Sequence, residues 1–193
     1  MAPYTTLAEA ENTAENCKKA IKACEEALQV CTLENFPVYY AMTKTNLGIA
    51  HTVLAETENT AENCKKAVEA FGEALKVFTL KDFPVYYAWA QNSLAEAYNV
   101  LARIEDTAKN CRKAIRASKK AVKIYTLEDF PVEYADTQNN LGRAYTLLAR
   151  AEDTAKNSKK AMVSYKEALK VFRKDKFPER YEEVKENFFE AIS

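Results

Sequence analysis

The chain has 193 residues, of which 48% are hydrophobic and 29% charged, with three glycines and five prolines. This composition excludes a disordered or turn-rich chain and is typical of a soluble, nearly all-helical protein. The 28 basic and 28 acidic residues give a formal net charge of zero. No long-range field therefore attracts a nucleic acid or an anionic membrane surface, and neither is expected as a partner.

The sequence lacks signals for a membrane, for secretion and for a cofactor. No apolar run approaches the roughly 20 residues that span a bilayer, and the first residues, MAPYTTLAEAE, do not resemble a secretory signal. We therefore expect a cytoplasmic protein. The five cysteines lie within amphipathic runs without a CxxC or Cys/His pattern. Packing explains them better than metal or redox chemistry, so no metal or cofactor is expected.

The chain repeats with a period of 47 residues. Residues 11–20, ENTAENCKKA, return letter for letter at 58–67. A Phe-Pro pair keeps the same interval, at Phe36-Pro37, Phe83-Pro84, Phe130-Pro131 and Phe177-Pro178. A recurring unit of this length is a supersecondary element that buries its apolar face against copies of itself. We therefore expect residues 1–193 to form a single elongated repeat domain.

In this alignment the two ends of the chain correspond to the two halves of one helix. Residues 4–11 align with the back half of a helix in each later copy, and the segment from Pro178 onward aligns with the front half. One helix is therefore expected to be split between the ends, with a half helix at 4–11. The approximate helix pairs then occupy residues 12–58, 59–105, 106–152 and 153–193.

Each of these ranges begins with one amphipathic helix. A capping residue precedes it, at Asn12, Asn59, Asp106 and Asp153. Glu15 and Glu62 stand three residues later, as a capping box requires, but Lys109 and Lys156 replace them in the later copies. In the copy from Asn59 to Leu80, an apolar stripe keeps the three-and-four spacing of a helix, at Cys64, Ala67, Val68, Phe71, Ala74, Leu75 and Phe78.

A second helix follows each Phe-Pro pair. Proline cannot continue the preceding helix but suits the first turn of the next one. From Pro84 to Ile104 the apolar residues again keep helical spacing. Two antiparallel helices per unit follow, so the expected fold is an all-α solenoid of about four repeats.

The second of these helices carries a family resemblance. Leu47-Gly48, Leu94-Ala95 and Leu141-Gly142, each followed three residues on by His51, Tyr98 or Tyr145, resemble the Leu-Gly-x-x-Tyr core of the tetratricopeptide repeat. The other helices supply the matching Ala-x-x-x-large-x-x-Ala, as in Ala67, Phe71 and Ala74. The resemblance covers the whole chain. However, a period of 47 instead of about 34 makes it similar to the extended-helix subgroup, and Lys44, Gln91, Gln138 and Lys185 stand at the family's Trp position.

The resemblance implies a right-handed superhelix that binds an extended or helical peptide segment in a groove. The groove would be lined by the helices that begin at the Phe-Pro pairs, which the family counts as the first helix of each repeat. The positions that would face it are Met42, Thr45, Asn46, Ile49, Trp89, Asn92, Ser93, Glu96, Asp136, Asn139, Asn140, Arg143, Glu183, Glu186, Asn187 and Glu190. We expect a non-catalytic protein-interaction scaffold.

Asparagine recurs at these positions in every copy. Its amide both donates and accepts hydrogen bonds, which suits the backbone of a peptide. The alternative is that Asn46, Asn140 and Asn187, which share one repeat position, only bond to a neighbouring helix. The family's carboxylate clamp is absent, since Arg143 is the single cation of the set, so a bound peptide is expected to be basic towards the C-terminal half. Trp89, with Met42, would provide an apolar anchor or would pack between helices.

Signatures of catalysis are absent from the sequence. There is no HExxH, GxGxxG or Walker pattern, and His51 has no accompanying nucleophile and orienting acid. We therefore do not expect an enzyme. The split helix leaves an alternative function open, in which copies stack head to tail through their ends as a self-associating structural module. The competing interpretation is an array that tolerates these ends, or a fragment.

Overall fold

The computed structural model describes the backbone of residues 3–192 and the side chains of residues 13–192. Over this part of the chain it contains helices and no strand. The helices are α1 (Pro3–Leu28), α2 (Pro37–Leu54), α3 (Thr60–Val77), α4 (Pro84–Ala102), α5 (Thr107–Ala121), α6 (Pro131–Ala151), α7 (Thr154–Leu169) and α8 (Pro178–Ile192). The predicted all-α solenoid of about four repeats is confirmed.

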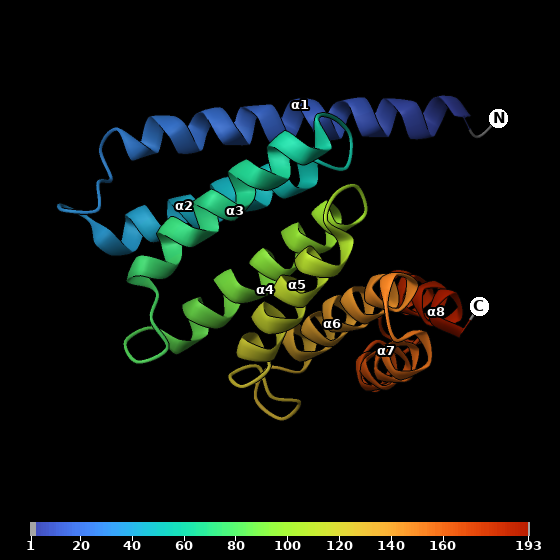
Figure 1. The fold of residues 1–193 in the computed structure, drawn as a ribbon. Coiled ribbons are helices and arrows are strands. Elements are labelled where there is room, and N and C mark those ends of the chain that lie inside the picture. Colours follow the sequence, from blue (N-terminus) through green and yellow to red (C-terminus); the bar gives the residue numbers. More distant parts are fainter. Residues whose placement is uncertain (1–2, 193) are drawn as a thin grey trace.

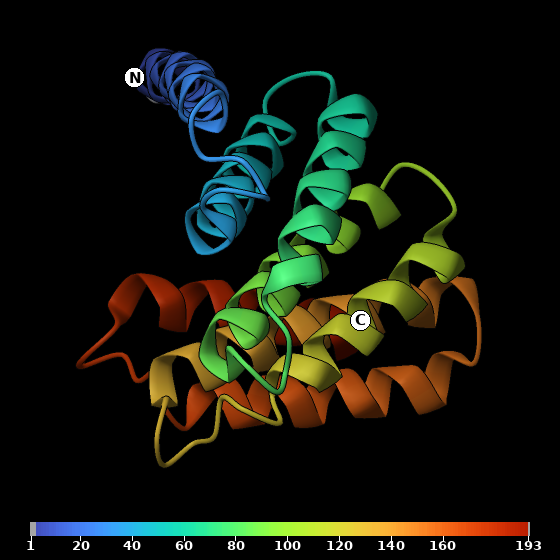
Figure 2. The same cartoon turned by 90° about the vertical axis from the view of Figure 1, so that its left-hand side faces the viewer.

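The helices form two layers (Figures 1 and 2). Each helix packs against its neighbours in the chain, and the even-numbered helices also contact one another, α2 with α4, α4 with α6 and α6 with α8. The odd-numbered helices make no such contacts among themselves in the described part of the chain. The even-numbered helices are therefore the continuous inner layer, and α1 and α8 lie at opposite ends of the array (Figure 1).

The Phe-Pro pairs fix the start of the even-numbered helices. Pro37, Pro84 and Pro131 occupy the first turn, where a missing N–H group costs nothing. The preceding phenylalanine packs against an aromatic ring at the end of the odd-numbered helix before it. Ring centroids are 5.9 Å apart for Phe78 and Phe83 and 5.6 Å apart for Phe172 and Phe177. This contact closes the connection between the two helices.

The starts of the odd-numbered helices differ from the predicted capping box. Asn59, Asp106 and Asp153 do occupy the N-cap position, but their backbone is left-handed, with φ of 48°, 46° and 45°, and none of their side chains caps the helix. A capping side chain needs an extended backbone at that residue. A different bond holds the turn before each helix: the side-chain amides of Asn63, Asn110 and Asn157 donate to the carbonyls of Glu58, Glu105 and Glu152 at 2.8–2.9 Å.

The predicted boundary at Asn12 is wrong. Helix α1 runs without a break from Pro3 to Leu28, so residues 4–11 form no separate half helix. A helix of eight residues is too short to be stable on its own, and continuing the helix satisfies its backbone hydrogen bonds. The side chain of Asn12 itself lies outside the described residues.

The left-handed turns give a first prediction. Asp106→Val is expected to lower the free energy of unfolding by about 1–2 kcal/mol, because a β-branched residue is strained at φ 46° whereas Asp tolerates it. Asp106→Gly, the matched control, should leave stability nearly unchanged because Gly reaches this conformation without strain. Urea unfolding followed by circular dichroism measures both. Equal losses for the two variants would contradict the assignment of strain.

A contact between a glycine and a buried ring recurs in two of the helix pairs, α2 with α3 and α6 with α7. A Cβ atom added to Gly48 would lie 2.7 Å from the ring of Phe71, and one added to Gly142 would lie still closer to the ring of Tyr165. The small residue on the even-numbered helix thus makes room for a buried ring on the odd-numbered one. In the middle pair, α4 and α5, the equivalent residues are Ala95 and Ser118.

Candidate functional site

A hollow of the inner layer lies over α4, α6 and α8. It is an open groove of about 790 Å³ lined by both acidic and basic side chains. Its lining residues include Glu56, Glu96, Arg103, Arg143, Thr146, Arg150, Tyr165, Arg180, Glu183, Asn187 and Glu190. Four arginines face four glutamates, so the groove as a whole has no net charge.

Ion pairs between helices take up most of these charges. Arg103 lies 3.3 Å from Glu56 and Arg150 lies 2.5 Å from Glu190. Arg180 of α8 lies 3.2 Å from Asp136 of α6, and 3.7 Å from Glu183 on its own helix. Each pair is partly exposed and contributes little stability by itself. Their effect on the groove is to leave few charges available to a ligand.

Glu96 and Arg143 are the exceptions. Neither forms an ion pair within the described residues, although both line the groove from adjacent helices. The Glu96 side chain is exposed to the hollow, but the surrounding groove atoms reduce the hydration of its carboxylate, and this desolvation raises its pKa against the opposing effect of Arg143; Glu56 and Asp136 raise the pKa further. An acid and a base with open hydrogen-bonding capacity therefore face the same hollow.

The pKa of Asp136, a carboxyl group next to the groove residue Arg180, is also raised. Burial raises its pKa, the Arg180 guanidinium opposes the rise, and the nearby Glu183 and Glu133 add to it. The surroundings of Glu96 and Asp136 thus disfavour the ionised forms of these two carboxyl groups. A cation placed there would stabilise them.

The predicted asparagine row connects the even-numbered helices. The Asn140 amide donates to the side-chain oxygen of Asn92 at 3.1 Å, and Asn187 donates to Asn139 at 3.2 Å. Asn139 in turn donates to Glu183 at 3.0 Å. These bonds match the alternative interpretation, in which the asparagines bond to a neighbouring helix. Asn46 is exposed.

The structure places the remaining predicted groove positions in different surroundings. Thr45 and Ser93 are buried, and the Thr45 hydroxyl donates to the Ala41 carbonyl at 2.8 Å. Met42, Ile49 and Trp89 are half-buried against apolar clusters, so Trp89 packs between helices. The structure brings Glu96, Arg143, Glu183, Asn187 and Glu190 together in the groove, while Glu186 is exposed outside its lining.

Three of the arginines that line the groove, Arg103, Arg150 and Arg180, were not predicted from the sequence. Arg103 and Arg150 share one repeat position with Glu56, directly after a Leu-Ala pair near the C-terminal end of α2, α4 and α6. The change from Glu in the first copy to Arg in the next two, at one repeat position, could have indicated that Arg103 and Arg150 belong to the site. Arg180 had no such signal, since its equivalents are Glu133 and two tyrosines.

Outside the groove, His51, Cys64 and Cys111 are buried, and their surroundings keep them unreactive. His51 shares a hydrogen bond of 3.0 Å with Asn63, and burial lowers its pKa. Burial raises the thiol pKa of Cys64 and Cys111 to about 11, which keeps both protonated at neutral pH. Among the described residues, no His, Cys, Asp and Glu side chains gather as a metal site would require, and no helix there has the length and apolar character needed to cross a membrane.

The chain was compared with protein-family models, curated proteins and solved structures, and no match was found.

Proposed function

We propose that the chain is a non-catalytic scaffold that binds a peptide segment of another protein in the groove over α4, α6 and α8. The observation that carries the proposal is the pair Glu96 and Arg143, one acid and one base, each without an ion-pair partner in the described chain and both facing the same hollow. The resemblance to tetratricopeptide repeats, together with a cytoplasmic location, remains part of this proposal.

The charges define the kind of peptide. A Lys or Arg side chain of the ligand fits beside Glu96, because a cation relieves the repulsion that Glu56 and Asp136 exert there. Arg143 presents donors suited to a carbonyl or carboxylate group. The asparagine row is already bonded between helices, so it shapes the floor of the groove and the two charged residues select the ligand.

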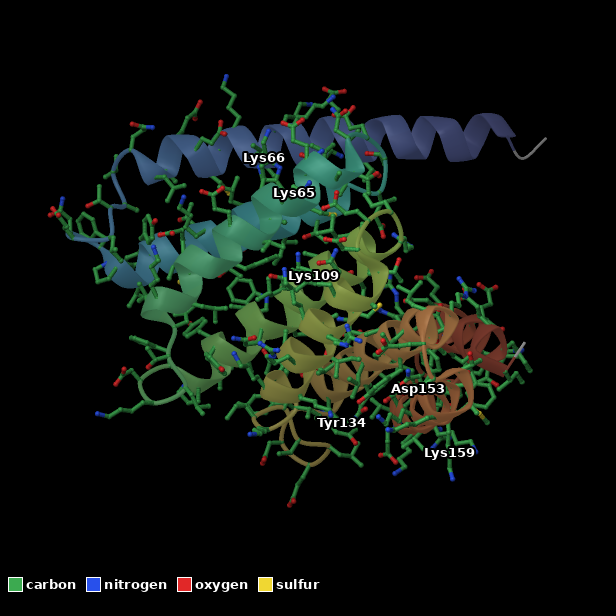
Figure 3. The ribbon with its side chains drawn as sticks, viewed as in Figure 1. Lys65, Lys66, Lys109, Tyr134, Asp153 and Lys159 are labelled. Atoms are coloured by element: carbon green, nitrogen blue, oxygen red, sulfur yellow. The ribbon has the colours of Figure 1, made fainter. Side chains whose placement is uncertain are left out.

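Paired substitutions test the groove. We expect Glu96→Gln to weaken binding of a Lys-containing peptide about tenfold, and Arg143→Gln to weaken binding of a peptide with a matching acid about tenfold. Matched controls are Glu69→Gln of α3 and Arg116→Gln of α5, exposed residues of the outer layer. Figure 3 shows that layer through Lys65 and Lys66 of α3 and Lys109 of α5.

The readout is fluorescence anisotropy or calorimetry with a peptide panel that varies one Lys and one acid at a time. Binding that is equally strong in the groove variants and the controls would remove the groove from consideration.

The affinity for a basic peptide is also expected to depend on pH. Glu96 binds a cation only when ionised, and its raised pKa in the free protein means that binding releases a proton at mildly acidic pH. Affinity should therefore rise with pH, by at most about tenfold per pH unit, until the free carboxyl is fully ionised. Titrations between about pH 4 and pH 7 measure this slope. Glu96→Gln should flatten it, and an unchanged slope in that variant would assign it to another group.

A further inference from the structure

The two ends of the array expose helix faces that are covered everywhere else. Each even-numbered helix packs on the odd-numbered helix that follows it, α2 on α3, α4 on α5 and α6 on α7. The equivalent face of α8 carries Phe189 and Ile192, which are 52% and 51% exposed. The equivalent face of α1 carries Ala20, which is exposed although its counterparts Ala67, Ala114 and Ala161 are fully buried.

The residues on these two faces fit each other in size. Within the array, the even-numbered helices carry residues 48, 95 and 142 at the repeat position opposite residues 71, 118 and 165 of the odd-numbered helices. Where the odd-numbered helix supplies a ring, the residue on the even-numbered helix is a glycine. The next residue in the first series is Phe189, and the residue that precedes Phe71 in the second is Cys24. At these end positions the ring lies on the even-numbered helix, α8, and the small residue lies on the odd-numbered helix, α1. Phe189 of one copy would therefore fill the space that Cys24 of another leaves.

A second position shows the same exchange. Ala41, Ala88 and Ala135 pack in the same clusters as Phe78, Tyr125 and Phe172 respectively. The next residue of the first series is Glu182, and the one that precedes Phe78 is Cys31. The larger side chain again lies on α8 and the smaller one follows α1. Glu182 also keeps its pairing with Lys185 at 3.2 Å in the free chain.

A hydrogen bond found in two of the helix pairs has a possible donor and a possible acceptor on the two end faces. Tyr40 donates to Glu73 at 3.3 Å and Tyr134 to Glu167 at 3.0 Å. In this series Tyr181 is the next donor, and Glu26 is the acceptor that precedes Glu73.

The asparagine series behaves in the same way. Its acceptors are Asn92 and Asn139, and Glu186 is the next residue at that position. Its donors are Asn140 and Asn187, and the first residue of the donor series is Asn46. Both Glu186 and Asn46 are exposed in the single chain.

We propose that α8 of one copy packs on α1 of a second copy, in the register of the array, so that copies join head to tail. The contact pairs Phe189 with Cys24, Tyr181 with Glu26 and Glu186 with Asn46 across the junction. Because the two surfaces differ, each copy keeps one free end and the assembly grows as an open chain of copies. The residues of α8 that form this contact do not line the groove, so the proposal stands independently of the groove.

Substitutions that exchange the side-chain sizes at positions 189 and 24 test the proposed contact. Phe189→Gly leaves a gap against Cys24, and Cys24→Phe places two rings in the space of one, so each single variant should weaken association at least about tenfold. The double variant recreates the small-and-ring combination of Gly48 and Phe71, and it should restore association. Glu69→Gln of α3 is the matched control. Circular dichroism verifies that each variant is folded.

Sedimentation velocity and light scattering over a range of concentrations provide the readout. The expected result for the natural chain is an average mass that rises with concentration beyond that of two copies. Three outcomes would overturn the proposal: a mass that stays at the 21.8 kDa of one chain, a mass that stops at two copies, or a double variant that associates no better than the single ones. Peptide binding in the groove, measured separately, is expected to be unaffected by these substitutions.

Discussion

Replacing Tyr165 with serine is expected to lower the free energy of unfolding by about 3–5 kcal/mol. The Tyr165 side chain is fully buried, its ring occupies the space above Gly142, and its hydroxyl lies 3.0 Å from that of Thr146. The substitution removes the ring and leaves a cavity between α6 and α7. Urea unfolding, followed by circular dichroism, measures the loss.

A second substitution tests whether the ring sets the spacing of the two helices. In the natural chain, Gly142→Ala should cost about 1–3 kcal/mol, because the added Cβ meets the Tyr165 ring. In the Tyr165→Ser background the same change should cost nearly nothing, since Ala95 and Ser118 form that combination in the middle pair. A cost that is equal in both backgrounds would show that the ring does not determine the spacing.

Introducing the glycine–ring combination into the middle pair, α4 and α5, is expected to raise the free energy of unfolding by about 2 kcal/mol. Ser118 is fully buried, and its hydroxyl and the side-chain oxygen of Asn99 have no hydrogen-bond partner among the described residues. The triple variant Ala95→Gly, Asn99→Thr, Ser118→Tyr introduces the same combination as Gly142, Thr146 and Tyr165. It adds a buried ring and removes two unpaired polar atoms, at the cost of one bond from Asn99 to the Asn140 carbonyl.

The control for this exchange is Ser118→Tyr alone. With the methyl group of Ala95 still present, the new ring has no space and the single variant should be less stable than the natural chain. Midpoints of urea unfolding distinguish the three proteins. A triple variant that is no more stable than the single one would show that the surroundings of the middle pair do not accept a ring.

Much of the fold follows from the sequence, because the period of 47 and the helical spacing of apolar residues are both local signals. The stripe of Cys64, Ala67, Phe71, Ala74 and Phe78 is buried as predicted. The helix starts were less predictable. Asp and Asn are typical both of N-caps and of left-handed turns, and the sequence does not distinguish a capping side chain from a left-handed backbone.

The candidate site was only partly predictable for a related reason. Helical spacing identifies the face on which Glu96 and Arg143 lie, but the partners of a charge come from other helices. The ion pair between Arg180 and Asp136 joins residues of different repeat units, and it depends on how closely α6 and α8 approach. The same holds for the asparagines, whose residue type suits a ligand and a neighbouring helix equally well.

The two layers differ in how firmly they are joined along the array. Side-chain hydrogen bonds connect α4 with α6 and α6 with α8, whereas α3, α5 and α7 do not pack on one another. Bending that changes the distances between the outer helices therefore breaks few contacts. Stretching the inner layer breaks the hydrogen bonds between its helices. The molecule should therefore resist stretching along the inner layer and bend more easily at the outer one, so that its curvature can vary while its inner contour keeps a constant length.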